Sequence, residues 1–354
     1  MSIVAEEVRL TRPRVFEQGT REVASPGPGE ALIRVTECGI CGSDLKMYGG
    51  GHPVHRPPLL LGHELIGEVA ALPGGYEGAL ALGTPVAVYP AINCGRCHAC
   101  RAGKSHICPR MRLIGGHEPG GMSQFVIAPE YNLVPIPEEM PPGLAVLTEP
   151  MAVAVHGVNR GRVEAGETTL VVGCGPVGLM TAMVLRQLGT TRVVVSDIAA
   201  GPLSRARDFG FEDVIDGSTQ DLGRALANMG FEEGVDVVFD CAGATDSPET
   251  GLRTLVPGGR LVLVGVPPAK IALDSVLLQR GERDIVGSML YTPAEFEEAM
   301  ELLASGIIPE TALAKGMVRS EYRLGDSPEA FELLASGDSP VLKLVIVHDA
   351  PDGP

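Results

Sequence analysis

The stretch LVVGCGPVG, from Leu170 to Gly178, decides how the middle of this 354-residue chain folds. Its first part is a short apolar, β-branched run, which is typical of a buried parallel strand. The run stops at the pattern Gly-x-Gly-x-x-Gly, and apolar residues at helical spacing follow it until Gly189. Strand, glycine turn and helix in this order are the context of a dinucleotide-binding fingerprint. A glycine-rich turn in some other α/β protein is the alternative interpretation.

The residues of this fingerprint have separate predicted roles. Gly173 permits the tight turn, Gly175 lets the backbone approach a pyrophosphate, and Gly178 lets the helix pack closely on the strand. Free amides at the positive end of the helix would then hold the pyrophosphate. The residues expected to bind the cofactor here are Gly173, Gly175, Pro176, Val177 and Gly178.

A carboxylate follows at the spacing that a bound ribose requires. The second strand candidate, 192–196, ends at Asp197, nineteen residues after Gly178. A ribose 2′-hydroxyl needs an acceptor at this place. Because an anion there repels a 2′-phosphate, the sequence predicts NAD rather than NADP as the cofactor.

The composition limits the class of protein. With 354 residues, 45% of them hydrophobic, the chain is long enough for two globular domains. A formal net charge of −16 disfavours nucleic acid and anionic membrane surfaces as partners. No apolar run approaches the roughly 20 residues of a membrane span, and residues 1–10 lack the apolar segment of a signal peptide. We therefore expect a cytoplasmic protein whose eight cysteines are reduced.

The pattern of apolar segments differs between the first and second parts of the chain. Until about residue 150, Gly and Pro turns separate short strand candidates, which predicts an irregular, mostly antiparallel barrel. From about Val153, strand candidates alternate with helices, which is the doubly wound pattern of a parallel sheet. A further helix is expected from Pro293, a strand that returns to the first domain over 341–347, and a frayed end over 349–354. The strand candidates are 30–36, 65–71, 85–89 and 123–128 in the first part and 170–173, 192–196, 213–215, 235–239, 260–264 and 284–289 in the second.

The pattern Cys-x2-Cys-x2-Cys-x7-Cys is the most specific in the chain. Four thiolates can close a tetrahedron on zinc at about 2.3 Å each. The lobe 93–108 has too few apolar residues for its own core, so a metal would contribute its folding energy. Four protein ligands leave no open position, which predicts a structural zinc; four free thiols or an iron–sulfur cluster are the alternatives. The predicted ligands are Cys94, Cys97, Cys100 and Cys108.

Four scattered residues offer a second set of metal ligands. Cys41 lies in the run Gly-Ile-Cys-Gly-Ser-Asp, His63 and Glu64 are adjacent, and Glu149 precedes a proline. A catalytic zinc takes three protein groups of these types and keeps one exchangeable position. From the chemistry alone the alternatives stay open. Cys41 can be a small buried hydrophobe, His63 a satisfied core histidine, and Glu149 the start of a turn.

Together these motifs resemble those of the zinc-dependent medium-chain dehydrogenases, in the branch of the sorbitol, polyol and threonine dehydrogenases. They occur in family order over nearly the whole chain. The resemblance implies a GroES-like β-barrel catalytic domain built from both chain ends, residues 1–150 and 290–354. It also implies an inserted Rossmann domain, residues 151–289, that binds NAD. The match is carried by 39–44, 62–64, 94–108, 149–150 and 173–178.

The resemblance also implies how the two domains would work together. A catalytic zinc is expected on Cys41, His63 and Glu64, with Glu149 as a direct or water-bridged partner. Zinc would act as a Lewis acid on the oxygen of a secondary alcohol while a hydride passes to the nicotinamide in a cleft. Ser43 is expected to relay the hydroxyl proton, and an ordinary turn hydroxyl is the alternative.

The residues that line the nicotinamide are assigned only by their position in the family. From the sequence itself they are ends of parallel strands, where such ligands bind. These residues are Val264, Gly265, Val266, Ser288, Met289 and Leu290.

Departures from the family pattern affect the expected substrate. Lys46 and Met47 stand where sorbitol dehydrogenases typically carry a histidine and a tyrosine, and Leu290 replaces the arginine that precedes Tyr291. Some of the groups that bind a polyol in sorbitol dehydrogenases are therefore missing. For this reason the expected substrates include a cyclitol and an amino alcohol as well as a polyol. His117 falls at the expected cleft rim, although a solvated loop is the simpler interpretation.

Other function classes are alternatives to a zinc dehydrogenase. They are a zinc-free quinone or enone reductase of the same superfold, a non-catalytic NAD-binding protein, and a hydrolytic metalloenzyme. The cysteine motif disfavours the first, the complete ligand set the second, and the glycine turn the third. The strand candidate 284–289 should lie at a sheet edge, and relatives are commonly dimers or tetramers, so a homodimer or homotetramer is expected.

Overall fold

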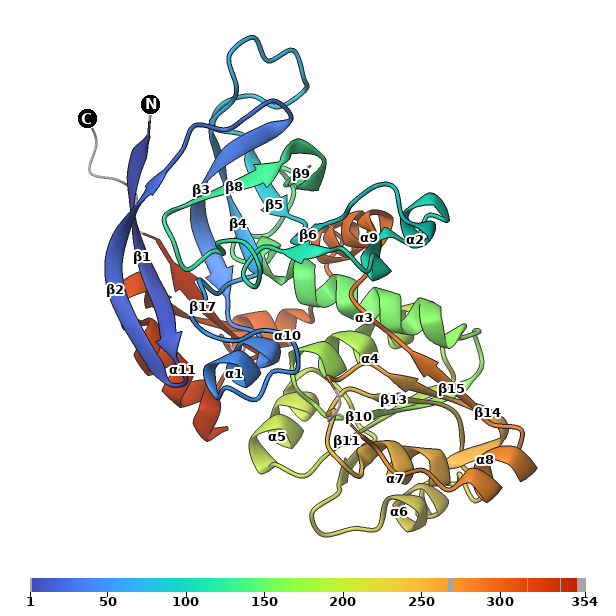
Figure 1. Cartoon of the computed structure of the whole chain (residues 1–354). Helices are drawn as coiled ribbons and strands as arrows, with labels where there is room; N and C mark the ends of the chain where they lie inside the picture. The colour runs from blue at the N-terminus through green and yellow to red at the C-terminus, as the bar shows by residue number, and fades with distance from the viewer. Residues whose placement is uncertain (1, 267–269, 317, 338, 349–354) are drawn as a thin grey trace. The chain divides into compact units, whose positions relative to one another are not determined.

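The structure, a computed structural model, describes residues 2–266, 270–316, 318–337 and 339–348, and the end predicted to fray, 349–354, lies outside them. The chain divides into two compact units (Figure 1). The first comprises Met1–Glu149, Thr292–Ala304 and Arg319–Pro354, and the second comprises Pro150–Tyr291 and Ser305–Val318. Among the described residues, none of the helices combines the length and the apolar character needed to cross a bilayer.

The segment 305–318 differs from the expected boundary, which assigned all of 290–354 to the first domain. The structure groups this segment with the second unit. Its helix α10 (Glu310–Ala314) buries Ala312. Beyond the helix, Lys315 Nζ lies 2.6 Å from Asp208 Oδ1 in the second unit. Local sequence does not reveal such a contact, because the two residues are 107 positions apart.

The first unit is built around a sheet of order β16-β17-β3-β4-β5-β9, with β8 also paired to β3. Its described strand pairs are antiparallel except β16 with β17. The sheet pairs β17 with β3. The sequence predicted a strand here that returns to the first domain but did not identify its partner strand. The strands of this sheet are β3 (Glu30–Gly39), β4 (Glu64–Ala71), β5 (Pro85–Val88), β8 (Phe125–Pro129), β9 (Leu133–Pro135), β16 (Arg319–Arg323) and β17 (Lys343–Val347). Around it lie α1 (Gly42–Tyr48), β6 (Ala91–Ile92), α2 (His98–Arg101), η1 (Ser105–Ile107), β7 (Arg112–Leu113), η2 (Glu130–Asn132), η3 (Ala145–Leu147), α9 (Pro293–Ala304), η4 (Leu324–Asp326) and α11 (Ser327–Ser336).

A long hairpin of β1 (Ile3–Arg12) and β2 (Val15–Val23) precedes this sheet and was not expected from the sequence. Its charged residues hide the alternation that marks a strand. Ala5 and Leu10 are fully buried, and Glu7 is almost buried because its carboxylate pairs with two guanidinium groups, at 2.8 Å from Arg9 and 3.2 Å from Arg21.

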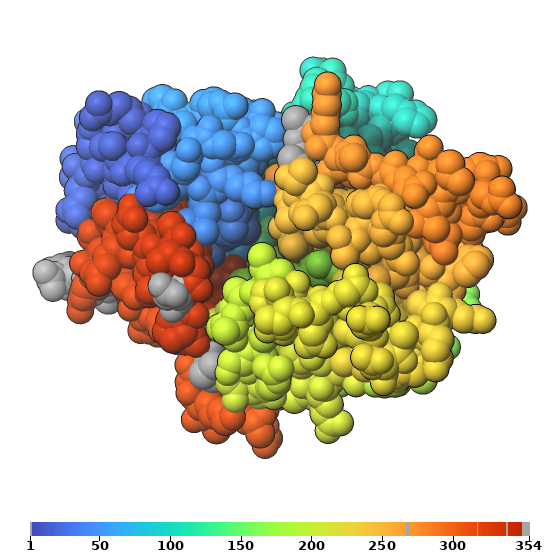
Figure 2. All heavy atoms as spheres, turned by 90° about the horizontal axis from the view of Figure 1, so that it is seen from below, coloured from blue at the N-terminus to red at the C-terminus, as the bar shows by residue number. Residues whose placement is uncertain are grey.

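Both chain ends take part in the surface of the first unit. Figure 2 shows blue atoms of the N-terminal hairpin beside red atoms of the C-terminal segment. A hydrogen bond joins them, since Gln18 Nε2 donates to the carbonyl oxygen of Gly325 at 3.0 Å. The core beneath combines residues from the first 133 positions with residues from 330–346, among them Leu10, Ile33, Leu61, Val86 and Phe331.

The second unit is a six-stranded parallel sheet of order β12-β11-β10-β13-β14-β15, which confirms the doubly wound pattern. The glycine fingerprint follows β10, next to the middle of the sheet (Figure 1). The strands are β10 (Thr168–Val172), β11 (Arg192–Asp197), β12 (Val214–Asp216), β13 (Val235–Asp240), β14 (Leu255–Leu263) and β15 (Asp284–Gly287). The helices are α3 (Thr148–Gly161), which begins just before the boundary, α4 (Pro176–Leu188), α5 (Ala200–Asp208), α6 (Leu222–Asn228), α7 (Ser247–Arg253) and α8 (Ser275–Arg280), in addition to α10.

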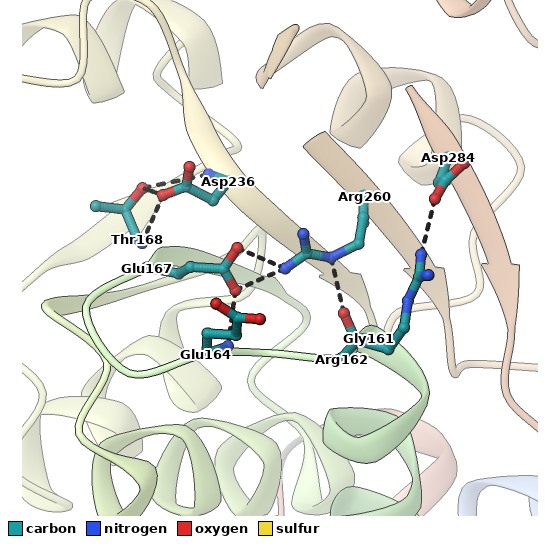
Figure 3. Close-up of polar contacts among 8 residues, drawn as sticks. All are labelled: Gly161, Arg162, Glu164, Glu167, Thr168, Asp236, Arg260 and Asp284. Atoms are coloured by element: carbon teal, nitrogen blue, oxygen red, sulfur yellow. Dashed lines mark hydrogen bonds and ion pairs between the residues drawn. The ribbon is translucent and has the colours of Figure 1, made fainter. Parts of the chain in front are cut away.

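A polar network fixes the amino ends of these strands to the end of α3 (Figure 3). The guanidinium of Arg260, on β14, donates to both carboxylate oxygens of Glu167 at 2.7 and 2.6 Å and to the Gly161 carbonyl at 2.7 Å. Beside it, Asp236 accepts hydrogen bonds from the backbone N–H and the hydroxyl of Thr168 at 2.8 and 2.6 Å. The network therefore sets the start of β10, the strand that leads into the glycine turn.

We expect Arg260→Met to lower the free energy of unfolding by roughly 1–3 kcal/mol, because charge-assisted hydrogen bonds to Glu167 and a hydrogen bond to the Gly161 carbonyl are lost at a largely buried position. Arg162→Met is the matched control. Its pair with Asp284 is mostly exposed, at 67% and 60%, so its loss should cost about 1 kcal/mol or less. Urea unfolding followed by far-UV circular dichroism measures both, since the chain has no Trp. Equal shifts in the two variants would contradict the structural role of Arg260.

Candidate functional site

The four cysteines of the lobe 93–108 converge on one point. Sulfur atoms bound at about 2.3 Å to one tetrahedral ion lie about 3.8 Å apart. The sulfur–sulfur distances are 3.4 Å from Cys97 to Cys100, 3.5 Å from Cys94 to Cys108, 3.8 Å from Cys97 to Cys108 and 4.0 Å from Cys94 to Cys100. The residues present therefore fit a four-sulfur zinc site.

Local hydrogen bonds prepare these thiols for a cation. The Cys100 backbone N–H donates to Cys97 Sγ at 3.4 Å, and Arg110 Nη2 lies 3.4 Å from Cys94 Sγ. A backbone hydrogen bond from Arg96, helped by Cys108 and Arg110, lowers the pKa of Cys94 to about 5. Because the thiolate is the form that binds metal, this environment favours ligation by Cys94. Burial and the neighbouring thiols act in the opposite direction on Cys100 and raise its pKa to about 11.

A second group of ligand atoms forms within the first unit. Atoms of Cys41, His63 and Glu64 all lie within 4.8 Å of one another. Cys41 is the residue before α1, while His63 and Glu64 stand at the start of β4. Strand β3 leads into Cys41 and pairs with β4 at Gly39 and Glu64, which explains why residues 22 positions apart meet. Thiol, imidazole and carboxylate together are a donor set of the kind that catalytic zinc uses.

Asp44, whose role the sequence interpretation missed, orients this group. Its fully buried carboxylate lies 3.3 Å from His63 Nδ1 and accepts the Cys41 backbone N–H at 3.0 Å. Burial lowers the pKa of His63, but Asp44 and Cys41 outweigh it and raise the pKa well above the ordinary value. With Nδ1 turned to a carboxylate, Nε2 is the nitrogen available for a metal. The sequence signal that could have identified Asp44 is its position, three residues after Cys41 and in the first turn of α1.

Ser43 stands at the same ring. Its Oγ is 3.4 Å from His63 Nε2. A hydroxyl at this nitrogen lies beside the place where a metal and its exchangeable ligand would be, so it can exchange a proton with a group bound there.

Glu64 forms a buried ion pair that local sequence does not reveal. Its Oε1 lies 2.7 Å from Lys343 Nζ, and the two residues are 0% and 2% exposed. Burial lowers the pKa of Lys343, but Glu64 and Cys41 raise it by more, so the pKa lies above its ordinary value. Glu64 Oε2 is buried without a hydrogen-bond partner among the described residues. A Cβ on Gly39 would overlap this oxygen, so glycine is required there. The only hint in the sequence was one lysine in the apolar segment 341–347.

Neither Glu149 nor Met47 lies where the sequence interpretation placed it. Glu149 is buried in the first turn of α3, but its carboxylate is not in the group within 4.8 Å. Its charge nevertheless helps to raise the pKa of Lys343, so it lies near the cluster. Met47, expected at a substrate-binding position, is 1% exposed and packs in the core.

The glycine turn of the second unit has the shape of a phosphate cradle. Gly173 has φ +99°, a left-handed conformation that favours glycine. A Cβ on Gly178 would overlap the Gly173 carbonyl oxygen, whereas a Cβ on Gly175 would meet nothing within 4 Å. Helix α4 begins at Pro176, followed by Val177, and no side chain caps its amino end. Its first amides thus face open space beside Gly175, which fits a pyrophosphate.

Two carboxylates shape the loops around this turn. Asp197, at the end of β11, accepts backbone N–H groups from Cys174 at 2.7 Å, Ile198 at 2.7 Å and Ala199 at 2.9 Å. Asp240, at the end of β13, was not singled out from the sequence. Its Oδ1 accepts the N–H of Gly243 at 3.1 Å. Both carboxylates hold loop backbone at the carboxyl edge of the sheet, where ligands bind in this architecture.

The residues assigned to the nicotinamide lie at this same edge. The N–H groups of Val264 and Gly265 donate to the Asp240 carbonyl at 2.9 and 2.8 Å, and the next residue is Val266. The N–H of Ser288 donates to the Leu263 carbonyl at 2.9 Å. The side chains of Met289 and Leu290 follow Ser288, and Met289 is 53% exposed. The loops after β14 and β15 are therefore adjacent, but their contact with a cofactor stays a prediction.

We expect Lys343→Met to cost roughly 3–5 kcal/mol of unfolding free energy, because it leaves the Glu64 carboxylate buried without its cation. The double variant Lys343→Met/Glu64→Gln removes both charges and should recover most of this loss. Lys315→Met, which breaks a more exposed pair, is the control and should cost about 1 kcal/mol or less. Urea denaturation measures the cycle. Additive losses in the double variant would show that Glu64 and Lys343 do not interact.

Comparison with known proteins relates both parts of the chain to known families. Residues 27–138 match the family model described as "Alcohol dehydrogenase GroES-like domain", and residues 176–305 match that described as "Zinc-binding dehydrogenase". An L-threonine 3-dehydrogenase of Rhizobium rhizogenes is 31% identical over 320 residues, covering 90% of this chain and 91% of the relative. An L-galactonate-5-dehydrogenase of Escherichia coli is 30% identical over 335 residues, covering 95% and 96%.

A solved structure extends the likeness to the whole fold. A zinc-binding dehydrogenase from Sinorhizobium meliloti, bound to NADP, is similar with a TM-score of 0.88 and 30% identity, over 98% of this chain and 99% of that one. Matches of this extent confirm the GroES-like and Rossmann folds inferred from the sequence. The chain therefore belongs to the zinc-type medium-chain alcohol dehydrogenase family.

Proposed function

We propose that this protein moves a hydride between a secondary alcohol and NAD, with a zinc ion held by Cys41, His63 and Glu64. The observation that carries the proposal is the convergence of thiol, imidazole and carboxylate within 4.8 Å in one unit. The other unit supplies a glycine cradle for a dinucleotide. A non-catalytic NAD-binding protein would have no need of the buried groups that orient these ligands.

The catalytic group divides its work among named residues. Cys41 Sγ and His63 Nε2 hold the metal, and Asp44 keeps the imidazole in the required orientation. When bound, zinc supplies Lewis-acid polarisation of the alcohol oxygen. Ser43 Oγ, 3.4 Å from His63 Nε2, takes the hydroxyl proton towards solvent. NAD would supply the hydride acceptor, and the glycine turn at Gly173, Gly175 and Gly178 would hold its pyrophosphate.

Glu64 and Glu149 have unequal parts in this proposal. Lys343 retains Oε1 of Glu64 at 2.7 Å, which leaves Oε2 as the oxygen that can reach a metal. Glu149 is buried but outside the group, so it acts through a water or through the electrostatic field. Glu64 is thus the stronger candidate for the third protein ligand.

A second zinc is proposed in the lobe 93–108. The sulfur distances of 3.4–4.0 Å there fit one tetrahedral ion with no open position, so this metal supports structure. We therefore propose two zinc ions for each chain.

The cofactor and substrate are proposed more specifically than the family requires. Asp197 is held by three backbone amides and presents a fixed anion, which favours NAD although the solved relative binds NADP. The curated relatives are named for threonine and galactonate. A polyol, a cyclitol or an amino alcohol is the proposed substrate class, in a cytoplasmic protein. A homodimer or homotetramer stays a prediction, for which β15 offers the sheet edge.

Metal content separates the two proposed zinc sites. Plasma mass spectrometry should find two zinc ions per chain in the wild type. It should find one per chain in Cys41→Ser and one per chain in Cys97→Ala. Cys41→Ser should lose turnover but retain NAD binding and its melting temperature, whereas Cys97→Ala should melt at a lower temperature. Cys241→Ser, outside both groups, is the control and should keep both ions. Turnover by Cys41→Ser would overturn the catalytic site, and iron in the wild type would indicate a cluster in the lobe.

Cofactor choice tests Asp197. We expect Asp197→Asn, which keeps an acceptor oxygen but removes the charge, to lower the ratio of kcat/KM with NAD to that with NADP by about tenfold or more. Asp216→Asn changes the carboxylate at the end of the neighbouring strand β12 and serves as control. Initial rates with each dinucleotide give the ratio. An unchanged ratio in Asp197→Asn would show that this carboxylate does not select the cofactor.

A further inference from the structure

Three histidines outside the ligand group gather in the first unit. His52 and His55 follow α1, and His117 lies in the turn after β7. Their rings form a row, with centroids 4.9 Å apart from His52 to His55 and 4.5 Å apart from His55 to His117. His52 and His55 are half-buried and His117 is exposed. Among the described residues, these three do not form a group with ligand atoms within 4.8 Å, so they are not arranged as a metal site.

The row of histidines lies beside the catalytic group. The turn that carries His117 packs on the backbone just before His63, since the N–H of Gly121 donates to the Gly62 carbonyl at 2.8 Å. A Cβ on Gly115 would lie 2.8 Å from the backbone nitrogen of His63. The charges of Asp44 and His63 also affect the pKa of both His52 and His55.

Backbone hydrogen bonds fix the tautomer of the two outer rings. His52 Nδ1 accepts the N–H groups of Val54 at 3.2 Å and His55 at 3.0 Å, and His117 Nδ1 accepts that of Leu113 at 3.1 Å. Because an accepting Nδ1 carries no proton, a neutral ring holds its proton on Nε2. Each outer ring therefore presents an Nε2–H donor. Among the described residues, neither Nε2 has a hydrogen-bond partner.

The surroundings of His52 and His55 lower the pKa of both rings and add positive charge. Burial lowers the pKa of His52. Burial, together with His117 and His52, lowers the pKa of His55 to about 4. Lys46 and Arg56 are near enough to lower the pKa of His52 as well. Two nearby carboxylates are already engaged: Asp44 by His63 and by the Cys41 N–H, and Glu118, next to His117, by Arg112 at 2.8 Å.

We propose that His52 and His117, with His55 between them, form a subsite for oxygen atoms of the substrate other than the reacting hydroxyl. This inference rests on the proposed function and narrows its substrate class. Hydroxyl and carboxylate oxygens accept hydrogen bonds from Nε2–H, whereas an ammonium has three donors and no acceptor. The cations Lys46 and Arg56 also repel an ammonium. The substrate is therefore a polyol or a hydroxy acid, and an amino alcohol is excluded by its charge and its donors.

Substrate pairs that share a carbon skeleton test this subsite. Sorbitol is compared with glucamine, its 1-amino analogue, and propane-1,2-diol with 1-aminopropan-2-ol. The enzyme, with its zinc, is assayed for NAD reduction as wild type, His52→Phe and His117→Phe, which keep an aromatic ring but remove the donor. His98→Phe, an exposed histidine in the lobe 93–108, is the control variant. Calorimetric titration with sorbitol supplies a binding readout independent of turnover.

The wild type should favour the hydroxyl member of a pair at least tenfold in kcat/KM. His52→Phe and His117→Phe should each reduce that preference several-fold, mainly through a higher KM, and should weaken sorbitol binding, while His98→Phe matches the wild type. The subsite would be overturned if the wild type preferred the amino member or had no preference. It would also be overturned if both variants kept the wild-type preference. Neither result would contradict the proposed dehydrogenase activity. A wild type that oxidises neither member of either pair, nor simple secondary alcohols, would overturn the proposed function itself.

Discussion

The ion pair between Glu64 and Lys343 is the contact on which the candidate metal site depends. It joins residues 279 positions apart, at 2.7 Å and with almost no exposure to solvent. A carboxylate buried in this way would be costly without a cation beside it. Lys343 can supply the cation only because β17 returns to β3, next to β4. The two ends of the chain therefore both contribute to the geometry of one cluster.

Asp44 plays the corresponding part for His63. One buried carboxylate holds the imidazole through Nδ1 and the Cys41 backbone through its N–H. The positions of two proposed metal ligands, Cys41 and His63, are thus coupled through a third residue outside the ligand set. The same principle acts at the second unit, where Asp197 and Asp240 fix loop backbone around the glycine turn. In each place a carboxylate that contacts neighbouring backbone amides gives the site a defined geometry.

Much of the fold was predictable from local patterns. The alternation of strands and helices after about residue 150 predicted the parallel sheet, because buried parallel strands are continuous apolar runs. The hairpin β1–β2 was missed because Glu7 and the arginines around it resemble a solvated segment until their pairing is seen. The boundary at 305–318 was wrong for a similar reason. Its contact with Asp208 links residues that are distant in the sequence.

By itself, the sequence determined the family, the glycine turn and the identity of the four lobe cysteines, because each depends on residue types at short, fixed spacings. Tertiary structure decided which scattered groups meet. It brought Cys41, His63 and Glu64 together, left Glu149 outside, and revealed Lys343 and the row of histidines. The physical reason is that buried charges and fixed tautomers depend on partners contributed by remote strands and loops. No local pattern of residues encodes which partner will arrive.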